Sequence, residues 1–312
     1  MNRRNFIRTL AIAGAAMSVK QTEAMTLFNQ RVGATASKNA FDLVAVLGGE
    51  PVAMFRKAIA ELGGIGTFVK KGQKVVVKPN IGWDKAPEFA SNTNPLLVGE
   101  IVRQCIAAGA SEVVVFDHTC DDWRASYRAS GIEAAAKSAG ARVVPAHEES
   151  YYRTVSLPNA KSLKTTKIHQ AILDCDVWIN VPVLKNHGGA KMTISMKNLM
   201  GIVWDRRFFH SNDLQQCIAD ICTYDKKPVL NVVDAYRMMK TNGPRGKSEA
   251  DVVLSKGMFL SQDMVAVDTA ATNFFNQVRE MPLDAVGHLA RGQEMKVGTM
   301  DLDKLSIKRI RM

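Results

Sequence analysis

Cysteine is scarce in this sequence, with five in 312 residues, and none lies in a Cys-x-x-Cys pair or at ferredoxin spacing. An iron–sulfur cluster held by this chain alone is therefore not expected. Cys217 and Cys222 fall on one expected helix, where five residues separate the α-carbons by about 8 to 9 Å, too far for a comfortable disulfide. We expect most of the cysteines to be buried apolar side chains.

Blocks of five or six like charges are also absent, although the formal net charge is +11. Residues 1–24 hold four basic residues and one acidic residue, so the remainder keeps +8, spread along its length. That spread argues against a nucleic-acid partner, and the positive sign suits a small anionic ligand or an anionic envelope surface better. The sequence has no nucleophile elbow, Walker loop or Gly-x-Gly-x-x-Gly fingerprint. No motif therefore supports a hydrolase, a phosphotransferase or a dehydrogenase.

The first 24 residues have the order of a twin-arginine signal peptide. Arg3-Arg4 is followed by Phe6, an apolar run at 10–19 and small residues near Ala24 where cleavage could occur. The run has about ten residues, whereas a helix that crosses a bilayer needs about twenty, so we expect no stable membrane span. This order predicts recognition by the twin-arginine export machinery and a periplasmic or otherwise exported location. Because that route carries folded proteins, it raises the expectation of a cofactor.

Residues 25–40 are polar with small side chains, and we expect a flexible start there, followed by a single domain at 41–312. Strands and helices alternate in that domain, which predicts an α/β fold with a largely parallel sheet and helices on both faces. The less regular stretch 147–167 predicts a small inserted lobe or an antiparallel excursion. Expected strands are 43–47, 74–77, 112–116, 142–144, 177–183, 229–233 and 257–260, with an edge strand within 304–311; expected helices are 95–108, 131–138, 213–223 and 264–276.

Polar clusters follow several of the expected strands. In open parallel sheets, ligands bind outside the carboxyl ends of the strands, so these clusters predict a shared polar rim. The simpler alternative is that loops are polar in any case. The clusters are Lys78-Pro79-Asn80, Asp117 to Asp122, Lys185 to Gly189, Asp234 to Arg237, and Ser261 to Asp263.

The cluster from Lys185 to Gly189 is the densest. Lys78 and Lys185 could each pair with a phosphate or carboxylate of a ligand, or with strand-end carbonyls and carboxylates of the protein. The ligand is favoured for Lys185, because Gly188-Gly189 would let backbone N–H groups approach it and could lead into a following helix.

Residues 191–200 fit both an alternating strand and the face of a helix. We prefer a helix that stops at Gly201. Lys197 and Asn198 would then lie in its last turn, where they either face the rim or complement the helix dipole.

Oxygen and imidazole ligands occur together within six residues, at Asp117, His118, Asp121 and Asp122, and His187 could add another. This composition suits a divalent metal such as zinc, manganese or iron. An aspartate just after a strand can instead cap the next helix. His118 and His187 could alternatively act as a general acid or base. The other histidines, His147, His169, His210 and His288, stand apart from the strand ends and are expected at the surface or in packing.

Four segments, namely 76–80, 182–187, 196–201 and 261–268, resemble the bacterial and archaeal family known as domain of unknown function 362. The resemblance runs from about Phe41 to the C-terminus. It implies the α/β fold and a site made by Lys78, Asn80, Lys185, His187, Lys197 and Asn198. Some members carry a fused ferredoxin-type module, whose cysteines this chain lacks. The resemblance implies no established reaction.

Two classes of function remain. One is an exported enzyme that acts on a small anionic substrate, with or without a divalent metal. The other is a binding, cofactor-maturation or redox-accessory protein that holds an anionic ligand, a metal or a redox partner without turning it over. For the enzyme, the catalytic candidates are His187, His118 and Lys185, and the candidates for binding a cofactor or ligand are Lys78, Asn80, Gly188, Gly189, Lys197 and Asn198.

Overall fold

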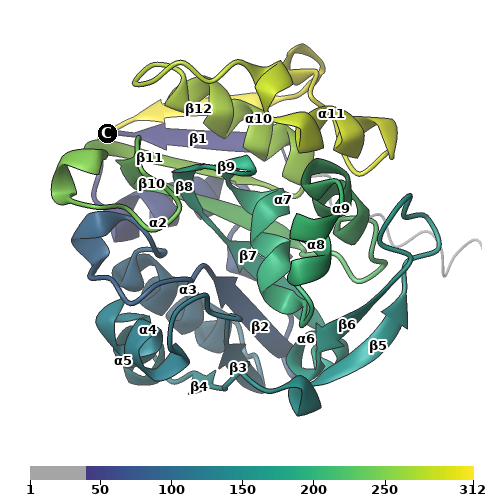
Figure 1. The fold of residues 1–312 in the computed structure, drawn as a ribbon. Helices are drawn as coiled ribbons and strands as arrows, with labels where there is room; N and C mark the ends of the chain where they lie inside the picture. Colours follow the sequence, from purple (N-terminus) through teal and green to yellow (C-terminus); the bar gives the residue numbers. More distant parts are fainter. Residues whose placement is uncertain (1–39) are drawn as a thin grey trace, which may run out of the picture. The chain divides into compact units, whose positions relative to one another are not determined.

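The computed structural model describes residues 40–312, so the predicted signal peptide and, apart from Ala40, the predicted flexible start lie outside the described residues. Within this part of the chain, ten strands form one sheet, whose main path has the order β12-β1-β11-β10-β7-β2-β3-β4 (Figure 1). The pairs from β10 through β7, β2 and β3 to β4 are all parallel. The expectation of an α/β fold with a largely parallel sheet is confirmed.

The strands of this sheet are β1 (Leu43–Leu47), β2 (Lys74–Pro79), β3 (Glu112–Val115), β4 (Arg142–Val143), β7 (Val177–Val181), β8 (Val183–His187), β9 (Lys191–Thr193), β10 (Leu230–Met239), β11 (Val252–Ser261) and β12 (Ile307–Arg311). The α-helices are α2 (Pro51–Glu61), α3 (Pro95–Ala107), α4 (Trp123–Ala129), α5 (Ile132–Ser138), α6 (Gln170–Asp174), α7 (Ser195–Asn198), α8 (Arg207–Ser211), α9 (Leu214–Ile221), α10 (Met264–Phe275) and α11 (Gly287–Glu294). Short 3-10 turns are η1 (Ile65–Thr67), η2 (Pro87–Phe89), η3 (Glu149–Tyr151), η4 (Leu199–Ile202), η5 (Glu249–Asp251), η6 (Leu283–Ala285) and η7 (Leu302–Lys304).

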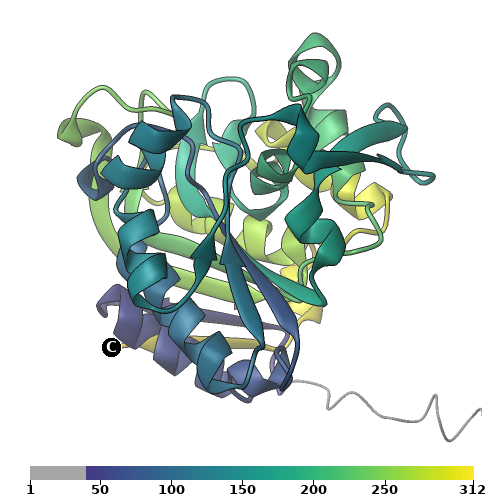
Figure 2. The ribbon, with the colours of Figure 1, turned by 90° about the horizontal axis from the view of Figure 1, so that it is seen from below.

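The sheet separates two apolar cores. Val75 and Val77 of β2 face one core, while Val76 faces the other, because successive side chains of a strand point to opposite faces. Helices α2, α3 and α5 pack on the first face, and α9, α10 and α11 on the second (Figure 1, Figure 2). Burial on both sides explains why this strand is an uninterrupted valine run.

Polar side chains fix where the helices begin. Asn94 accepts a hydrogen bond from the Leu96 amide at the start of α3, and Asp263 accepts one from the Ala266 amide at the start of α10. Both caps agree with the helix starts expected from the sequence. Asp122 caps α4 in the same way, so one member of the cluster after β3 serves the helix rather than the rim.

Two of the expected strand-end clusters do not lie at the rim. Asp234 to Arg237 are inside β10, which continues to Met239. Ser261 to Asp263 follow β11, which is antiparallel to β1 and β10, so this cluster lies at the opposite edge of the sheet. The predicted rim is therefore built from fewer strands than the sequence indicated, since alternation alone does not give strand direction.

The segment after β8 also differs from its prediction. Gly188-Gly189 join β8 to β9 in an antiparallel hairpin and do not lead into a helix. The helix predicted over 191–200 is wrong for its first residues, which form β9, and α7 starts only at Ser195. Gly201 does not stop a helix, because it lies inside η4.

The irregular stretch 147–167 contains the antiparallel excursion that the sequence indicated. Strands β5 (Tyr152–Ser156) and β6 (Thr165–His169) pair in a separate two-stranded ribbon. The C-terminal strand β12 is an edge strand of the main sheet, as predicted. Among residues 40–312, no helix is long and apolar enough to cross a membrane.

Candidate functional site

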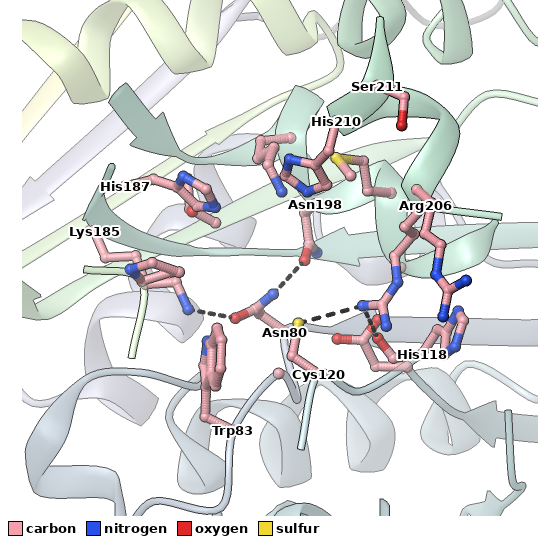
Figure 3. A pocket seen from close by; sticks show the side chains of 18 residues that line it. Asn80, Trp83, His118, Cys120, Lys185, His187, Asn198, Arg206, His210 and Ser211 are labelled. Atoms are coloured by element: carbon pink, nitrogen blue, oxygen red, sulfur yellow. Dashed lines mark hydrogen bonds between the residues drawn. The ribbon is translucent and has the colours of Figure 1, made fainter. Parts of the chain in front are cut away.

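A pocket of about 570 Å³ opens beyond the carboxyl ends of β2 and β3 (Figure 3). The segment after β2 supplies Asn80 and Trp83, and the segment after β3 supplies His118 and Cys120. The β8–β9 hairpin contributes Lys185, His187 and Thr193; helix α7 contributes Lys197 and Asn198; and residues in and before α8 contribute Arg206, Arg207 and His210. Segments distant in the sequence thus form one site where the parallel-sheet rule places it.

A buried ion pair lies at the base of the pocket. Lys78 Nζ is 2.8 Å from Asp117 Oδ1, and both side chains are almost fully buried. The other Asp117 oxygen accepts a hydrogen bond from the Ile81 amide at 2.6 Å. Burial lowers the pKa of Lys78, and the Asp117 charge acts against that shift. A Cβ atom at Gly201 would lie 1.9 Å from Asp117 Oδ1, so a larger residue there would displace the pair.

Amide side chains connect this ion pair to Lys185. Lys78 Nζ donates to Asn198 Oδ1 at 2.8 Å, and the same oxygen accepts from Asn80 Nδ2 at 3.0 Å. Asn80 Oδ1 in turn accepts from Lys185 Nζ at 2.9 Å (Figure 3). The amide orientations are therefore fixed by the two lysines, and the four side chains act as one hydrogen-bonded unit.

Lys185 has no carboxylate partner among the described residues. Its Nζ donates to Asn80 Oδ1 and to the Ser91 carbonyl, both of which are neutral acceptors. The side chain is buried yet contributes to the pocket wall. Burial lowers the pKa of Lys185 to about 7, and the nearby Lys197 charge adds to the shift. A substantial fraction of this amine is thus neutral near pH 7.

Lys197 is a second lysine of the pocket without a carboxylate partner among the described residues. It is half-buried on α7, and no hydrogen bond or ion pair of its Nζ occurs within residues 40–312. Burial lowers the pKa of Lys197 to about 8. Among the described residues that line the pocket, Asp117 is the one carboxylate, and Lys78 neutralises it. An anion that entered would meet positive charge without a competing protein carboxylate.

His187 and His118, two of the three histidines that line the pocket, are neutral but present different groups. His187 Nδ1 accepts from the Ala190 amide, so its proton lies on Nε2. His118 Nδ1 bonds the Val203 carbonyl and carries the proton, which leaves Nε2 as an acceptor. Burial lowers the pKa of His187 to about 2 and that of His118 to about 4. His187 is therefore a hydrogen-bond donor, while His118 offers a lone pair for a proton.

The residues predicted to bind a metal have separate partners. Asp117 pairs with Lys78, His118 stacks on Trp204 with ring centroids 5.1 Å apart, and Asp121 pairs with Arg245 at 3.3 Å. Within the described part of the chain, no group of three His, Cys, Asp or Glu side chains is arranged to hold a metal ion. Asp117 and His118 line the pocket, but Asp121 does not.

Most of the other predicted site residues lie together. Asn80, Lys185, His187, Lys197 and Asn198 line the pocket, and Lys78 lies beneath it. Gly188 and Gly189 do not line it, and the Gly188 amide donates to the Gly243 carbonyl at 3.3 Å. The Gly188 amide thus already has an acceptor in the loop after β10, and the hypothesis that this turn cradles a ligand with its amides stays a prediction.

Several pocket residues were not predicted from the sequence. Cys120 is exposed in the pocket and not an apolar filler; its Sγ lies 3.4 Å from Arg206 Nη1. His210 stood apart from the strand-end pattern because it belongs to α8, a short helix with no strand before it. In the sequence, the adjacent basic pair Arg206-Arg207 could have indicated that this segment contributes to an anion-binding site.

The fold and the pocket define an α/β protein with a cationic site at the carboxyl ends of its strands. Residues 75–273 match the family described as domain of unknown function (DUF362), and the chain belongs to this family. It is also similar to the "Thylakoid-associated protein sll1697" of Synechocystis sp. (strain ATCC 27184 / PCC 6803 / Kazusa), with 24% identity over 233 residues, 72% of this chain and 70% of the relative.

Two solved structures share parts of the fold. The lactate racemase apoprotein from Thermoanaerobacterium thermosaccharolyticum matches with a TM-score of 0.49 and 11% identity, over 76% of this chain and 57% of that one. A protein from Thermotoga maritima matches with a TM-score of 0.45 and 10% identity, over 80% of this chain and 60% of that one. The match thus spans less than two thirds of either solved chain.

Proposed function

We propose that this protein is an enzyme that binds a small anionic molecule in the pocket between β2, β3 and the β8–β9 hairpin. The observation that carries the proposal is the pairing pattern of the lysines. Lys78 has a carboxylate partner, whereas Lys185 has only neutral acceptors and Lys197 has no partner among residues 40–312. Two cations held near an open cavity without counter-ions gain free energy when an anion enters.

Proton transfer is the second part of the proposal. His118 Nε2 has no hydrogen-bond partner among residues 40–312 and is an acceptor on a neutral ring, and Lys185 is an amine that titrates near pH 7. Groups of this kind can take a proton from a bound substrate and return it. His187, held neutral with its proton on Nε2, would orient the anion by donating a hydrogen bond.

Anion binding is tested by the melting temperature of the protein in sulfate and in malonate at constant ionic strength. We expect both anions to raise the melting temperature. The Lys197→Met variant should lose this rise, while Lys57→Met, which changes an exposed cation on α2, should keep it. If the anions raised the melting temperatures of the two variants equally, this result would contradict the proposed site.

Turnover is tested separately, by NMR of small carboxylates incubated with the protein in D2O. Deuterium incorporation or chemical conversion that disappears in His118→Asn, with anion binding retained, supports the enzyme. Binding without any such change across the panel would favour the non-catalytic alternative, in which the pocket only holds its ligand.

We also propose that the protein is exported by the twin-arginine route to the periplasm or beyond. The support is the order of Arg3-Arg4, Phe6 and the apolar run at 10–19. Cell fractionation tests it: a variant with Arg3→Lys and Arg4→Lys should stay in the cytoplasm, and Arg8→Lys should be exported normally. Unchanged export of the double variant would argue against this route.

A further inference from the structure

Lys185 differs from Lys78 in one respect that affects its chemistry. Both side chains are buried, at 1% and 0% exposure. Lys78 faces a carboxylate at 2.8 Å, which stabilises its ammonium form. Lys185 faces only amide and carbonyl oxygens. A buried ammonium without a counter-ion is unfavourable, so near pH 7 the neutral amine is populated beside the ammonium form at this position, and a neutral lysine amine is a nucleophile.

Thr193 supplies a second, independent observation. It pairs with Lys185 in the β8–β9 ladder, so the two side chains emerge on the same face of the hairpin. Thr193 lines the pocket and is 3% exposed, and its hydroxyl has no hydrogen-bond partner among the described residues. Buried hydroxyls without partners are rare in native proteins. This one is placed to bond a polar atom of a ligand that reaches the Lys185 amine.

Lys197 completes the arrangement. It belongs to α7, which begins two residues after β9, and it contributes to the same pocket. Its ammonium group can hold a carboxylate while the other end of the ligand reaches Lys185 and Thr193. The pocket thus combines an anion-binding cation, a nucleophilic amine and an unpaired hydroxyl.

We propose that Lys185 forms an imine with the carbonyl carbon of a small oxo acid, whose carboxylate lies at Lys197 and whose carbonyl oxygen bonds the Thr193 hydroxyl. The proposal rests on the function proposed above and names its substrate class. In the first step, the nitrogen lone pair forms an N–C bond, and the C=O π electrons move to oxygen, which is protonated.

In the second step, the C–O bond of this carbinolamine breaks as the C=N bond forms. The two hydrogens of the amine leave with the carbonyl oxygen as one water molecule, so the step consumes no oxidant or reductant. Thr193 would hold that oxygen in the carbinolamine, and the imine nitrogen would then draw electrons from the adjacent carbon. The pKa of about 7 for Lys185 supports this assignment.

The test is reductive trapping of the full protein at pH 7 with pyruvate and sodium cyanoborohydride, followed by peptide mapping by mass spectrometry. We expect the reduced pyruvate adduct on Lys185 to form at least about tenfold faster than on Lys57, because an exposed lysine is almost entirely protonated at this pH. Malonate, which has carboxylates but no ketone, should slow the labelling of Lys185.

Two variants and a second carbonyl compound test the roles of Lys185 and Thr193 and the need for a carboxylate on the ligand. Lys185→Arg should form no adduct at this position, and the wild-type peptide map decides the question even if that variant fails to fold. Thr193→Val should slow trapping about tenfold, because the oxygen of the carbinolamine then loses the hydrogen bond of the Thr193 hydroxyl. Acetaldehyde, which lacks a carboxylate, should label Lys185 more slowly than pyruvate.

The melting and trapping measurements together separate the imine at Lys185 from the anion site. If pyruvate raises the melting temperature but Lys185 is not labelled preferentially, the imine is excluded and the anion site stands. If acetaldehyde labels Lys185 as fast as pyruvate does, the assignment of an oxo acid is wrong. If neither pyruvate nor malonate stabilises the protein and no adduct forms, both proposals fail.

Discussion

At the scale of the residue, the Lys78–Asp117 pair determines how the base of the pocket is held. Its two side chains have essentially no contact with solvent, and further hydrogen bonds tie them to Asn198 and to the Ile81 amide. Pairs of this kind add little compared with apolar packing, but they are costly to break, because one charge then remains buried without its partner.

Lys78→Met should therefore destabilise the protein strongly. It keeps most of the side-chain volume and leaves the Asp117 carboxylate without its cation, so we expect the free energy of unfolding to fall by about 3–5 kcal/mol. Urea denaturation at pH 7 measures this. Lys57→Met breaks an exposed pair with Glu61 at 3.5 Å and should cost about 0.5 kcal/mol or less. Similar losses in the two variants would show that the buried pair is not a structural anchor.

The two unpaired lysines predict how anion binding depends on pH. The pKa values of Lys185 and Lys197 are lowered to about 7 and about 8, mainly by burial. Both amines are protonated below pH 7, and both lose charge as the pH rises through 8. Sulfate affinity should be highest at the acid end and fall across this window, with proton uptake on binding. Titration calorimetry with sulfate between about pH 6 and pH 9 measures both quantities; a flat profile would contradict the assignment.

At the scale of the element, the loop between β10 and β11 forms one wall of the pocket through Pro244. Asp251 holds this loop by accepting hydrogen bonds from the Thr241 hydroxyl at 2.6 Å and the Lys247 amide at 2.7 Å, among others. These bonds, that of Thr241 first, lower the pKa of Asp251. The loop also contacts the strand-end segments through the Arg245–Asp121 ion pair.

Asp251→Ala should loosen this loop without changing a side chain that lines the pocket. We expect faster hydrogen exchange at 241–250 and weaker sulfate binding, with the sheet amides unaffected. In the wild-type protein, the contribution of Asp251 is complete above the ordinary aspartate pKa of about 4 and is lost as the pH falls below it. Glu249→Ala, an exposed neighbour on η5, is the control. Equal exchange in the two variants would show that Asp251 does not hold the loop.

The directions of the strands explain which residues of the site could be predicted from the sequence and which could not. Lys78, Asn80 and Lys185 were found because apolar runs followed by polar residues reveal the ends of strands, whereas Lys197 was placed in the last turn of an expected helix. Ser261 to Asp263 were misplaced because β11 runs antiparallel, and apolar runs do not encode direction. The hairpin turn at Gly188-Gly189 was read as the approach to a helix, since glycines permit both. Thr193 and His210 could be assigned to the site only from tertiary packing.

At the scale of the whole described part of the chain, one sheet carries two apolar cores. The fold class followed from the sequence because the alternation of strands and helices is regular, whereas the division into two cores depends on which helix covers which face. Val75 and Val76 are adjacent on β2, are both 1% exposed and face opposite cores. They offer a matched pair for asking whether the two cores fold together.

Val75→Ala and Val76→Ala should each lower the free energy of unfolding by about 2 kcal/mol, the loss expected for two buried methyl groups and a small cavity. Because the cores share every central strand, we expect one cooperative transition in each variant. Urea denaturation followed by far-ultraviolet circular dichroism and by tryptophan fluorescence measures this. Trp178 lies in the core that Val76 faces, and Trp123 packs against the core that Val75 faces. Coincident curves in both variants would establish cooperativity; a shift confined to one probe would show that the two faces unfold separately.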